Sequence, residues 1–178
     1  MKADAEASTK WLVPAGYAIR LRRVEDDPLL LVVENRAAEL FRNHGYPDLA
    51  DDPFDNMEDF RAMIGANRVW VAIAPEGLPV GYAVAGPLDD LVHLRELSVD
   101  PAHGRRGVGA ALVRTVLAAA KHQAAGGVSL TTFRDVPFNR PFYKKLGFEE
   151  LPSPTRHSRS APHLKMSCRP ASTRANGC

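Results

Sequence analysis

The sequence predicts an α/β domain in which a mixed, mostly antiparallel sheet carries helices on both faces. Two periodicities support this fold class: short runs alternate apolar and polar side chains, as strands do, and longer segments repeat apolar residues every three or four positions, as helices do. The strands come first as a meander and then alternate with helices, which indicates a mixed sheet. A chain of 178 residues that is 45% hydrophobic and 25% charged can bury the core of one such domain.

The N-terminal half of the domain begins with one strand and two helices. Residues 17–24 alternate apolar and polar side chains, which predicts the first strand. Over 28–44 the apolar residues recur at helical spacing, and Gly45 follows where a helix would end. A shorter helix is expected over about 57–64. Turn signals separate three further strand-like runs, which we expect to form an antiparallel meander: 69–74, 79–85 and 91–99.

The C-terminal half contains the clearest helical pattern, over 107–125, which ends at Gly126. This helix connects the strand 91–99 to a strand over 128–133, so these two strands are expected to be parallel. Two further elements follow the strand: a short helix over 139–146 and the beginning of a strand over 148–151.

The two ends of the chain lack such patterns. We expect a flexible segment over 1–16, the folded domain over 17–151, and a tail over 152–178 that contains four Pro and five Ser and is mostly disordered. A short edge strand over 163–167 is the exception within the tail. The tail contains five basic and no acidic residues, whereas the rest of the chain has 18 basic and 21 acidic residues.

Composition also limits location and partners. The net charge is only +2, so nucleic acid is not an expected partner. No signal-peptide pattern and no run of about 18 apolar residues is present, so no membrane association is expected. Both cysteines, Cys168 and Cys178, lie in the tail, which indicates a reducing, cytoplasmic location and no disulfide. The six histidines have no spacing typical of a zinc site, so we expect no metal.

A glycine-rich turn between the strand 91–99 and the long helix is the clearest candidate for a binding site. Glycines at 104, 107 and 109 let the main chain curl at the start of the helix, where several N–H groups lack an intrahelical partner. The helix dipole and the adjacent Arg105 and Arg106 add positive potential. The sequence therefore predicts a phosphate-binding turn.

Two common phosphate ligands are excluded by the spacing of this turn. A dinucleotide fold needs a third glycine where Leu112 stands, and no acidic residue ends a strand about twenty residues later. A nucleotide-triphosphate loop needs a lysine and a hydroxyl residue after its last glycine, where this chain has Ala110 and Ala111.

The turn Gly104-Arg-Arg-Gly-Val-Gly109 resembles motif A of the GCN5-related N-acetyltransferases, written Q/R-x-x-G-x-G/A, which holds the pyrophosphate of coenzyme A. Gly104 departs from the Gln or Arg of that motif. The segment Pro137–Phe148 is similar to motif B of the same family and contains Asn139 and Tyr143 four positions apart, on one face of the predicted helix. The resemblance covers residues 17–151 and implies a parallel pair that splays at the fourth and fifth strands.

The resemblance also implies an activity and site residues. It implies an acetyl-CoA-dependent N-acetyltransferase in which a primary amine, on a small molecule or a peptide, attacks the cosubstrate directly in a ternary complex. Glu96 is the candidate base, with His93 or water as alternatives, and Tyr143 is the candidate acid. The expected cofactor-binding residues are Leu97, Val99, Arg105, Arg106, Gly107, Val108, Gly109, Ala110, Asn139 and Tyr143.

Two matters stay open in the sequence. The same turn would also suit a non-catalytic module that senses acyl-CoA, and release of coenzyme A with an amine acceptor distinguishes an enzyme from such a sensor. Dimers are frequent in the family that the chain resembles, so it could form a homodimer.

Overall fold

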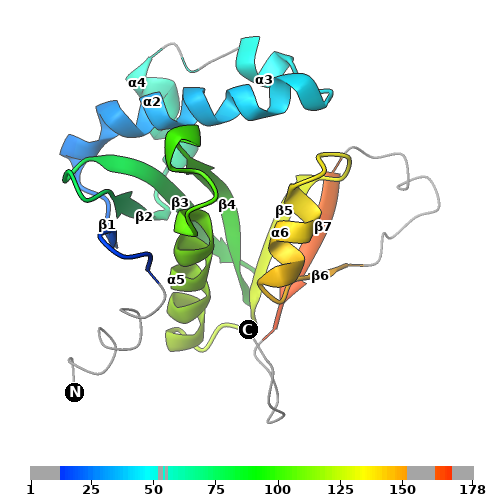
Figure 1. The fold of residues 1–178 in the computed structure, drawn as a ribbon. Helices are drawn as coiled ribbons and strands as arrows, with labels where there is room; N and C mark the ends of the chain where they lie inside the picture. The colour runs from blue at the N-terminus through cyan, green and yellow to red at the C-terminus, as the bar shows by residue number, and fades with distance from the viewer. Residues whose placement is uncertain (1–12, 52–53, 55, 152–162, 170–178) are drawn as a thin grey trace. The chain divides into compact units, whose positions relative to one another are not determined.

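A computed structural model describes residues 13–51, 54, 56–151 and 163–169 of the chain, and its strands form a seven-stranded mixed sheet in the order β1-β2-β3-β4-β5-β7-β6 (Figure 1). The parallel pair is β4 with β5, and β1 with β2, β5 with β7, and β6 with β7 are antiparallel. The predicted fold class is confirmed. The strands are β1 (Ala18–Leu21), β2 (Arg68–Ile73), β3 (Pro79–Leu88), β4 (Leu91–Val99), β5 (Val128–Phe133), β6 (Glu149–Glu150) and β7 (His163–Cys168).

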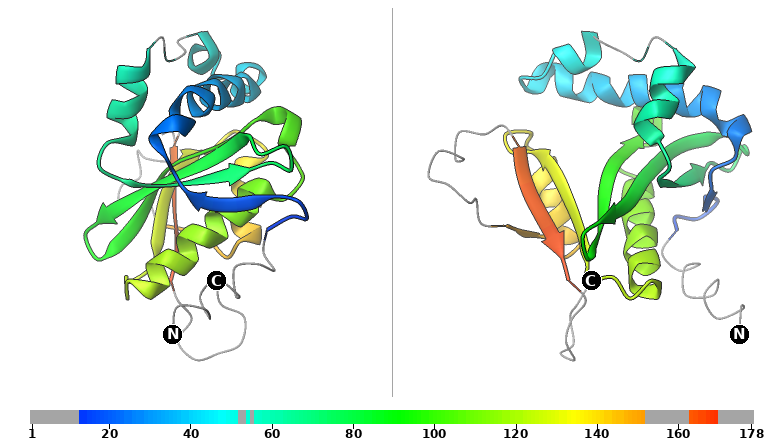
Figure 2. Two further views of the ribbon diagram at one scale, coloured as in Figure 1. Left: turned by 90° about the vertical axis from the view of Figure 1, so that its left-hand side faces the viewer. Right: turned by 180° about the vertical axis from the view of Figure 1, so that it is seen from behind.

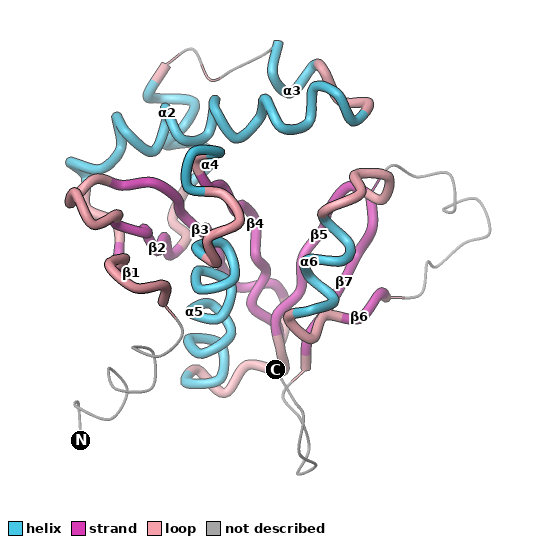
Figure 3. Tube along the Cα trace, in the orientation of Figure 1, coloured by secondary structure: helices cyan, strands magenta, loops and turns pink. Residues whose placement is uncertain are grey.

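Helices and short 3-10 turns connect these strands, as Figure 3 shows along the chain trace. The helices are α2 (Asp27–Ala38), α3 (Asp48–Asp51), α4 (Met57–Ile64), α5 (Val108–His122) and α6 (Asn139–Lys145), and the 3-10 turns are η1 (Val24–Asp26), η2 (Glu39–His44) and η3 (Pro101–His103). No helix of the described residues is both long and apolar enough to cross a bilayer.

The described residues form two compact units. The first contains the residues up to Val84 together with Glu96–Thr115, and the second contains Ala85–Arg95 and the residues from Val116 onward. The predicted domain limits 17–151 stay a prediction. Most of the predicted flexible ends, 1–12, 152–162 and 170–178, lie outside the described residues.

In the first unit, α2 and α4 cover one side of β1, β2 and β3, and the beginning of α5 lies on the other side (Figure 2). The core under α2 and α4 is apolar and continuous because both helices turn their apolar residues to the sheet. Phe60 of α4 packs edge-to-face on Tyr82 of β3, with ring centroids 5.9 Å apart. The buried members of this core are Leu30, Val33, Phe60, Ile64, Val69, Val71, Tyr82 and Val84.

Two elements of the first unit are shorter than the sequence predicts. The strand predicted over 17–24 ends at Leu21, and the helix predicted over 28–44 is α helical only to Ala38 and continues as η2. Gly45 ends this segment with φ of 90°, as the sequence indicates. The early end of β1 has a physical cause, since Arg20 in the strand and Arg22 after it pair with Asp26 and Asp27, the two residues where α2 begins.

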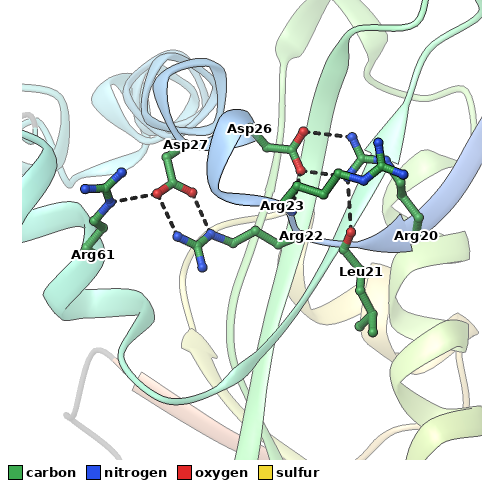
Figure 4. A network of polar contacts seen from close by, with 7 residues as sticks. All are labelled: Arg20, Leu21, Arg22, Arg23, Asp26, Asp27 and Arg61. Atoms are coloured by element: carbon green, nitrogen blue, oxygen red, sulfur yellow. Dashed lines mark hydrogen bonds and ion pairs between the residues drawn. The ribbon is translucent and has the colours of Figure 1, made fainter.

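These ion pairs connect three elements, as Figure 4 shows. Arg20 of β1 donates to both carboxylate oxygens of Asp26 at 2.7 Å. Arg22 donates to both oxygens of Asp27, at 2.5 and 2.6 Å, and Arg61 of α4 donates to one of them at 2.7 Å. The Asp27 side chain is fully buried, so the charge of this aspartate is compensated only by protein groups.

The balance at Asp27 favours the ionised carboxylate. Burial raises the pKa of Asp27, but the hydrogen bonds from Arg22 and Arg61 lower it more, so the pKa of this carboxyl lies below its ordinary value of 3.8. Asp27 therefore stays charged at neutral pH and ties the start of α2 to the end of β1 and to α4.

In the second unit, β7 is an interior strand. The short edge strand predicted over 163–167 is present as His163–Cys168, but it lies between β5 and β6 and buries Met166 completely. Gly127 permits the close pairing, because a Cβ at this position would lie 2.4 Å from the carbonyl oxygen of Cys168. Cys168 is disulfide-bonded, so the expectation of a chain without disulfides is wrong at this residue.

We expect Asp27→Asn to lower the free energy of unfolding at pH 7 by about 3 kcal/mol, because it leaves two guanidinium groups beside a buried neutral amide. The pKa of Asp27 is lowered by folding, so its stabilisation is present above the unfolded value and is lost as the pH falls through the folded value. Urea unfolding followed by circular dichroism at several pH values measures both effects. Asp51→Asn removes an exposed partner of Arg42 and should change stability little; equal losses in the two variants would contradict the role of Asp27.

Candidate functional site

The end of β4 is held by contacts from two other elements of the first unit. The N–H of Asp100, the residue after β4, donates to the carbonyl of Val80 on β3 at 2.9 Å. The Asp100 carboxylate accepts the N–H of Ala102 at 2.9 Å and the guanidinium of Arg36 on α2 at 2.8 Å. The strand thus ends at a capped η3 turn whose position is tied to both β3 and α2.

The main chain after η3 presents a run of unpaired donors. The N–H groups of His103 and Gly104 donate within η3, and the N–H of Ala111 donates to Gly107. Between them, the N–H groups of residues 105–110 have no hydrogen-bond partner among the described residues. Positive φ angles of 57° at Arg105 and 87° at Gly107 curl this segment at the start of α5. A curled segment of free N–H groups at a helix start suits a phosphate group.

Gly104, which departs from the family motif, fits a tight part of this turn. A Cβ on Gly104 would lie 3.1 Å from the carbonyl oxygen of Pro101. Steric crowding therefore accounts for the glycine. As a result, the turn has no side chain at this position that could contact a ligand. The predicted cationic residues Arg105 and Arg106 are both exposed beside the turn.

A tyrosine before β1 contacts the turn, a contact that no local pattern of the sequence indicated. The hydroxyl of Tyr17 lies 2.9 Å from Nδ1 of His103 and accepts a hydrogen bond from Arg106 at 3.3 Å. The rings of Tyr17 and His103 also meet edge-to-face, with centroids 5.9 Å apart. Tyr17 thus holds the cationic Arg106 beside the free N–H groups.

Strand β4 changes its hydrogen-bonding direction along its length. The N–H of Val92 donates to Gly127, on the β5 side, whereas the N–H of Asp100 donates to Val80, on the β3 side. In a regular strand, residues an even number apart direct their N–H groups to the same side, so an irregular step such as a β-bulge lies between these two residues.

Leu97 and Val99, the predicted partners of the cosubstrate's extended arm, lie in this part of β4. The N–H of Leu97 donates to the carboxylate of the preceding Glu96 at 2.9 Å. Both predicted residues are half-buried. A main-chain donor and the candidate base are thus in direct contact in this part of the strand.

The candidate base Glu96 is half-buried and belongs to a group of polar residues from β3, β4 and α2. Its carboxylate accepts the N–H of Leu97 and, at 3.3 Å, the hydroxyl of Ser98. Nearby, the fully buried Tyr82 of β3 donates its hydroxyl to the carboxylate of Glu34 on α2. The sequence analysis identified neither Tyr82 nor Glu34. Glu34 could have been noticed because it lies four positions after Leu30, so an acidic residue stands on the apolar stripe of its helix.

The surroundings of Glu96 and Tyr82 favour the protonated forms of these two side chains. Burial raises the pKa of Glu96 and the negative charge of Glu34 raises it further, to about 8, although hydrogen bonds from Leu97 and Ser98 act in the opposite direction. Burial and the two glutamate charges also raise the pKa of Tyr82 well above 10. Tyr82 is thus a neutral donor, and Glu96 is a carboxyl group that can hold or release a proton near neutral pH.

The alternative base, His93, has a different environment in the second unit. Its Nδ1 lies 2.9 Å from the hydroxyl of Ser129 on β5, which is its register partner. Burial lowers the pKa of His93, and Arg95 and Lys165 lower it further. His93 is therefore a neutral, hydrogen-bonded imidazole on the parallel strand pair.

The two motif B residues, Asn139 and Tyr143, both lie on α6 in the second unit. Asn139 is the first residue of the helix and does not cap it, since Phe138 occupies the N-cap position. Tyr143 is buried, and its ring contacts Phe142 and Phe148 edge-to-face, with centroids 4.9 and 5.7 Å apart. Of the other predicted residues, the structure brings Glu96 together with Leu97, and Arg106 together with Tyr17, in the first unit.

The described residues contain no group of three or more His, Cys, Asp or Glu side chains that could hold a metal ion.

Comparisons with known proteins identify relatives of this arrangement. Residues 33–148 match the model of the acetyltransferase (GNAT) family. A mycothiol acetyltransferase from Clavibacter michiganensis is 36% identical over 144 residues, which are 77% of this chain and 42% of the relative. The chain thus spans less than half the length of this curated relative.

Solved structures share the fold. The ribosomal-protein-S18-alanine N-acetyltransferase from Escherichia coli has a TM-score of 0.67 at 19% identity and covers 90% of this chain and 97% of its own. The PaiA N-acetyltransferase from Thermoplasma acidophilum, in complex with coenzyme A, also has a TM-score of 0.67, at 15% identity, and covers 86% of this chain and 98% of its own.

We expect Gly107→Ala to weaken binding of coenzyme A by about 10-fold or more, because a side chain at φ of 87° strains the turn and redirects its N–H groups. Gly77→Ala is a matched control, since Gly77 has φ of 84° in the turn between β2 and β3 and open space around its Cβ. Both variants should lose about 1 kcal/mol of stability. Calorimetric titration with coenzyme A should separate them, and equal affinities would contradict the assignment of the turn.

Proposed function

Because the chain belongs to the acetyltransferase (GNAT) family, we propose that it transfers the acetyl group of acetyl-CoA to a primary amine by direct attack in a ternary complex. The family match confirms the predicted family, and the proposed enzyme class and cosubstrate follow from it. The observation that carries the proposal is the run of unpaired N–H groups over residues 105–110 at the start of α5, which fits a diphosphate.

The residues of the turn and of β4 would hold the cosubstrate. The N–H groups of residues 105–110 would bind its phosphates. The main-chain groups of Leu97 and Val99 other than the Leu97 N–H, which donates to Glu96, would bind its arm. Asn139 and Tyr143 on α6 are the further proposed contacts. Acetyl-CoA would supply the acetyl group as a thioester: the amine nitrogen would bond to the acetyl carbon, the C–S bond would break, and coenzyme A would leave as a thiolate.

Glu96 is the proposed general base. An alkylammonium group has a pKa near 10, so an amine acceptor must lose a proton before it can attack. A carboxylate with an ordinary pKa near 4.5 is too weak a base for efficient transfer, whereas the pKa of Glu96 is raised to about 8. The Glu96 carboxylate would accept this proton directly or through one water molecule.

Tyr143 is the proposed general acid. A tyrosine hydroxyl has an ordinary pKa near 10 and can give its proton to a thiolate as it leaves. The aromatic contacts of Tyr143 with Phe142 and Phe148 fix its ring, which supports a defined direction for its hydroxyl.

The acceptor is a small-molecule or peptide amine. One relative is named for a small molecule, mycothiol, and one solved structure is named for an alanine of a ribosomal protein. These names describe those two proteins and illustrate the two kinds of acceptor. A cytoplasmic location, a homodimer, and the absence of membrane and nucleic-acid partners stay predictions from the sequence.

Release of coenzyme A from acetyl-CoA, measured with a thiol reagent across a panel of amines, tests the activity. The panel contains peptides with a free N-terminal alanine, peptides with lysine, amino sugars and polyamines. Turnover above the rate of hydrolysis with at least one amine supports the proposal. High affinity for coenzyme A without turnover on any amine would favour the acyl-CoA sensor.

Replacing the base should abolish the pH dependence of turnover. We expect kcat/KM of the native chain to rise with pH through a midpoint near 8, as Glu96 loses its proton. Glu96→Gln should lower kcat by about 10²-fold or more and remove this rise, with unchanged affinity for coenzyme A. Glu58→Gln, on the exposed first turn of α4, is the control and should behave like the native chain. Full turnover by Glu96→Gln would exclude Glu96 as the base.

Tyr143→Phe should lower kcat by about 10²-fold while it keeps the fold, because phenylalanine preserves the ring contacts and removes only the hydroxyl. Thermal unfolding and coenzyme A affinity check that the variant is intact. At low pH, where solvent supplies protons to the leaving thiolate more readily, the difference in kcat between the variant and the native chain should be smaller. Unchanged kcat would show that Tyr143 has only a packing role.

A further inference from the structure

A buried tyrosine connects the candidate base to a second carboxylate. Tyr82 on β3 is fully buried under α2 and α4, and its hydroxyl donates to the Glu34 carboxylate on α2. A buried hydroxyl needs such a partner, since a phenol without one is costly in an apolar core. Tyr82 therefore holds the Glu34 side chain at the edge of the core.

The candidate base lies on the strand next to this tyrosine. Glu96 is on β4, the neighbour of β3 in the sheet, and Ser98 donates to its carboxylate at 3.3 Å. The charges of Glu34 and Glu96 both act on Tyr82, and the charge of Glu34 acts on Glu96. Residues from α2, β3 and β4 thus form one electrostatic group within the first unit.

This group lacks a cation. No lysine, arginine or histidine among the described residues forms an ion pair with Glu34 or Glu96. Arg36, two residues after Glu34 on the same helix, pairs with Asp100 instead. Two interacting carboxylates without a cation cannot both be charged without a large repulsion, so the charge of one favours the protonated form of the other.

We propose that Glu34 is a positioning residue for acetyl transfer, which acts on Glu96 through its charge while the buried Tyr82 hydroxyl holds it in place. The inference rests on the proposed function, in which Glu96 accepts the proton of the acceptor's ammonium group. The negative charge of Glu34 acts on Glu96 and makes it a stronger base. A stronger base removes the proton of an ammonium group with a smaller loss of free energy.

The charge-neutral variant Glu34→Gln tests the role of Glu34 in the pH profile. It keeps an oxygen that can accept from Tyr82 but removes the charge. The midpoint of the rise in kcat/KM should move to lower pH by about one unit or more, and kcat at high pH should fall several-fold. Affinity for coenzyme A should not change. A midpoint equal to that of the native chain would overturn the proposal, whatever the change in kcat.

Two further variants separate the charge from a structural contribution. Glu34→Asp keeps the charge, so its midpoint should lie closer to the native one than that of Glu34→Gln. Glu39→Gln removes an exposed carboxylate from the segment after α2, where Glu39 pairs with Arg42, and should leave the profile unchanged. An equal shift in Glu34→Asp and Glu34→Gln would indicate a loss of structure and would contradict the proposal.

A titration that needs neither turnover nor a Glu34 variant keeps the inference testable if those variants do not fold. Carbon-13 NMR of the glutamate carboxyl groups should show one signal that titrates near pH 8 and is absent in Glu96→Gln. Because the interaction is mutual, Glu96→Gln should also change the titration of a second glutamate signal. No change in any other glutamate signal would overturn the proposal.

These measurements distinguish the failure of this inference from failure of the proposed function. Full turnover by Glu96→Gln would remove Glu96 as the base and would leave the mutual NMR titration of the two carboxyl groups in place. Loss of turnover by Glu96→Gln, with a native midpoint in Glu34→Gln, would contradict the role of Glu34 alone.

Discussion

The first unit depends on the buried carboxylate of Asp27, which fixes the start of α2. Arg22 at the end of β1 and Arg61 of α4 both donate to it, so one charged group joins three elements that are distant in sequence. Helix α2 makes further polar contacts along its length. Two such contacts lead to the candidate site: Glu34 accepts from Tyr82, and Arg36 pairs with Asp100 at the end of β4.

Two carboxyl groups of the first unit, those of Asp27 and Glu96, have pKa values shifted in opposite directions. At Asp27 the hydrogen bonds of two guanidinium groups outweigh burial, and the pKa is lowered. At Glu96 burial acts together with the like charge of Glu34, and the pKa is raised to about 8. The first arrangement stabilises the fold, and the second gives Glu96 the raised pKa that suits its proposed role as proton acceptor, so the neighbours of a carboxyl group influence which role it can take.

The local patterns of the sequence were sufficient for the fold class and for the position of the glycine-rich turn before α5. Helix α5 and the glycines before it follow from residues that are close in sequence, because helical spacing and left-handed backbone conformations are local properties. The same local reasoning placed the end of β1 three residues too late. There, ion pairs from Arg20 and Arg22 to the start of α2 turn the chain before the alternating pattern ends.

The sequence by itself determined that a strand, a glycine-rich turn and a long helix follow one another, and it identified Glu96 as a carboxyl group on that strand. Only the tertiary structure decided what surrounds Glu96, since Glu34 and Tyr82 come from other elements and their effect depends on distances through space. It also decided that β7 is an interior strand, although His163–Cys168 has little apolar pattern, because pairing with both β5 and β6 satisfies its backbone hydrogen bonds.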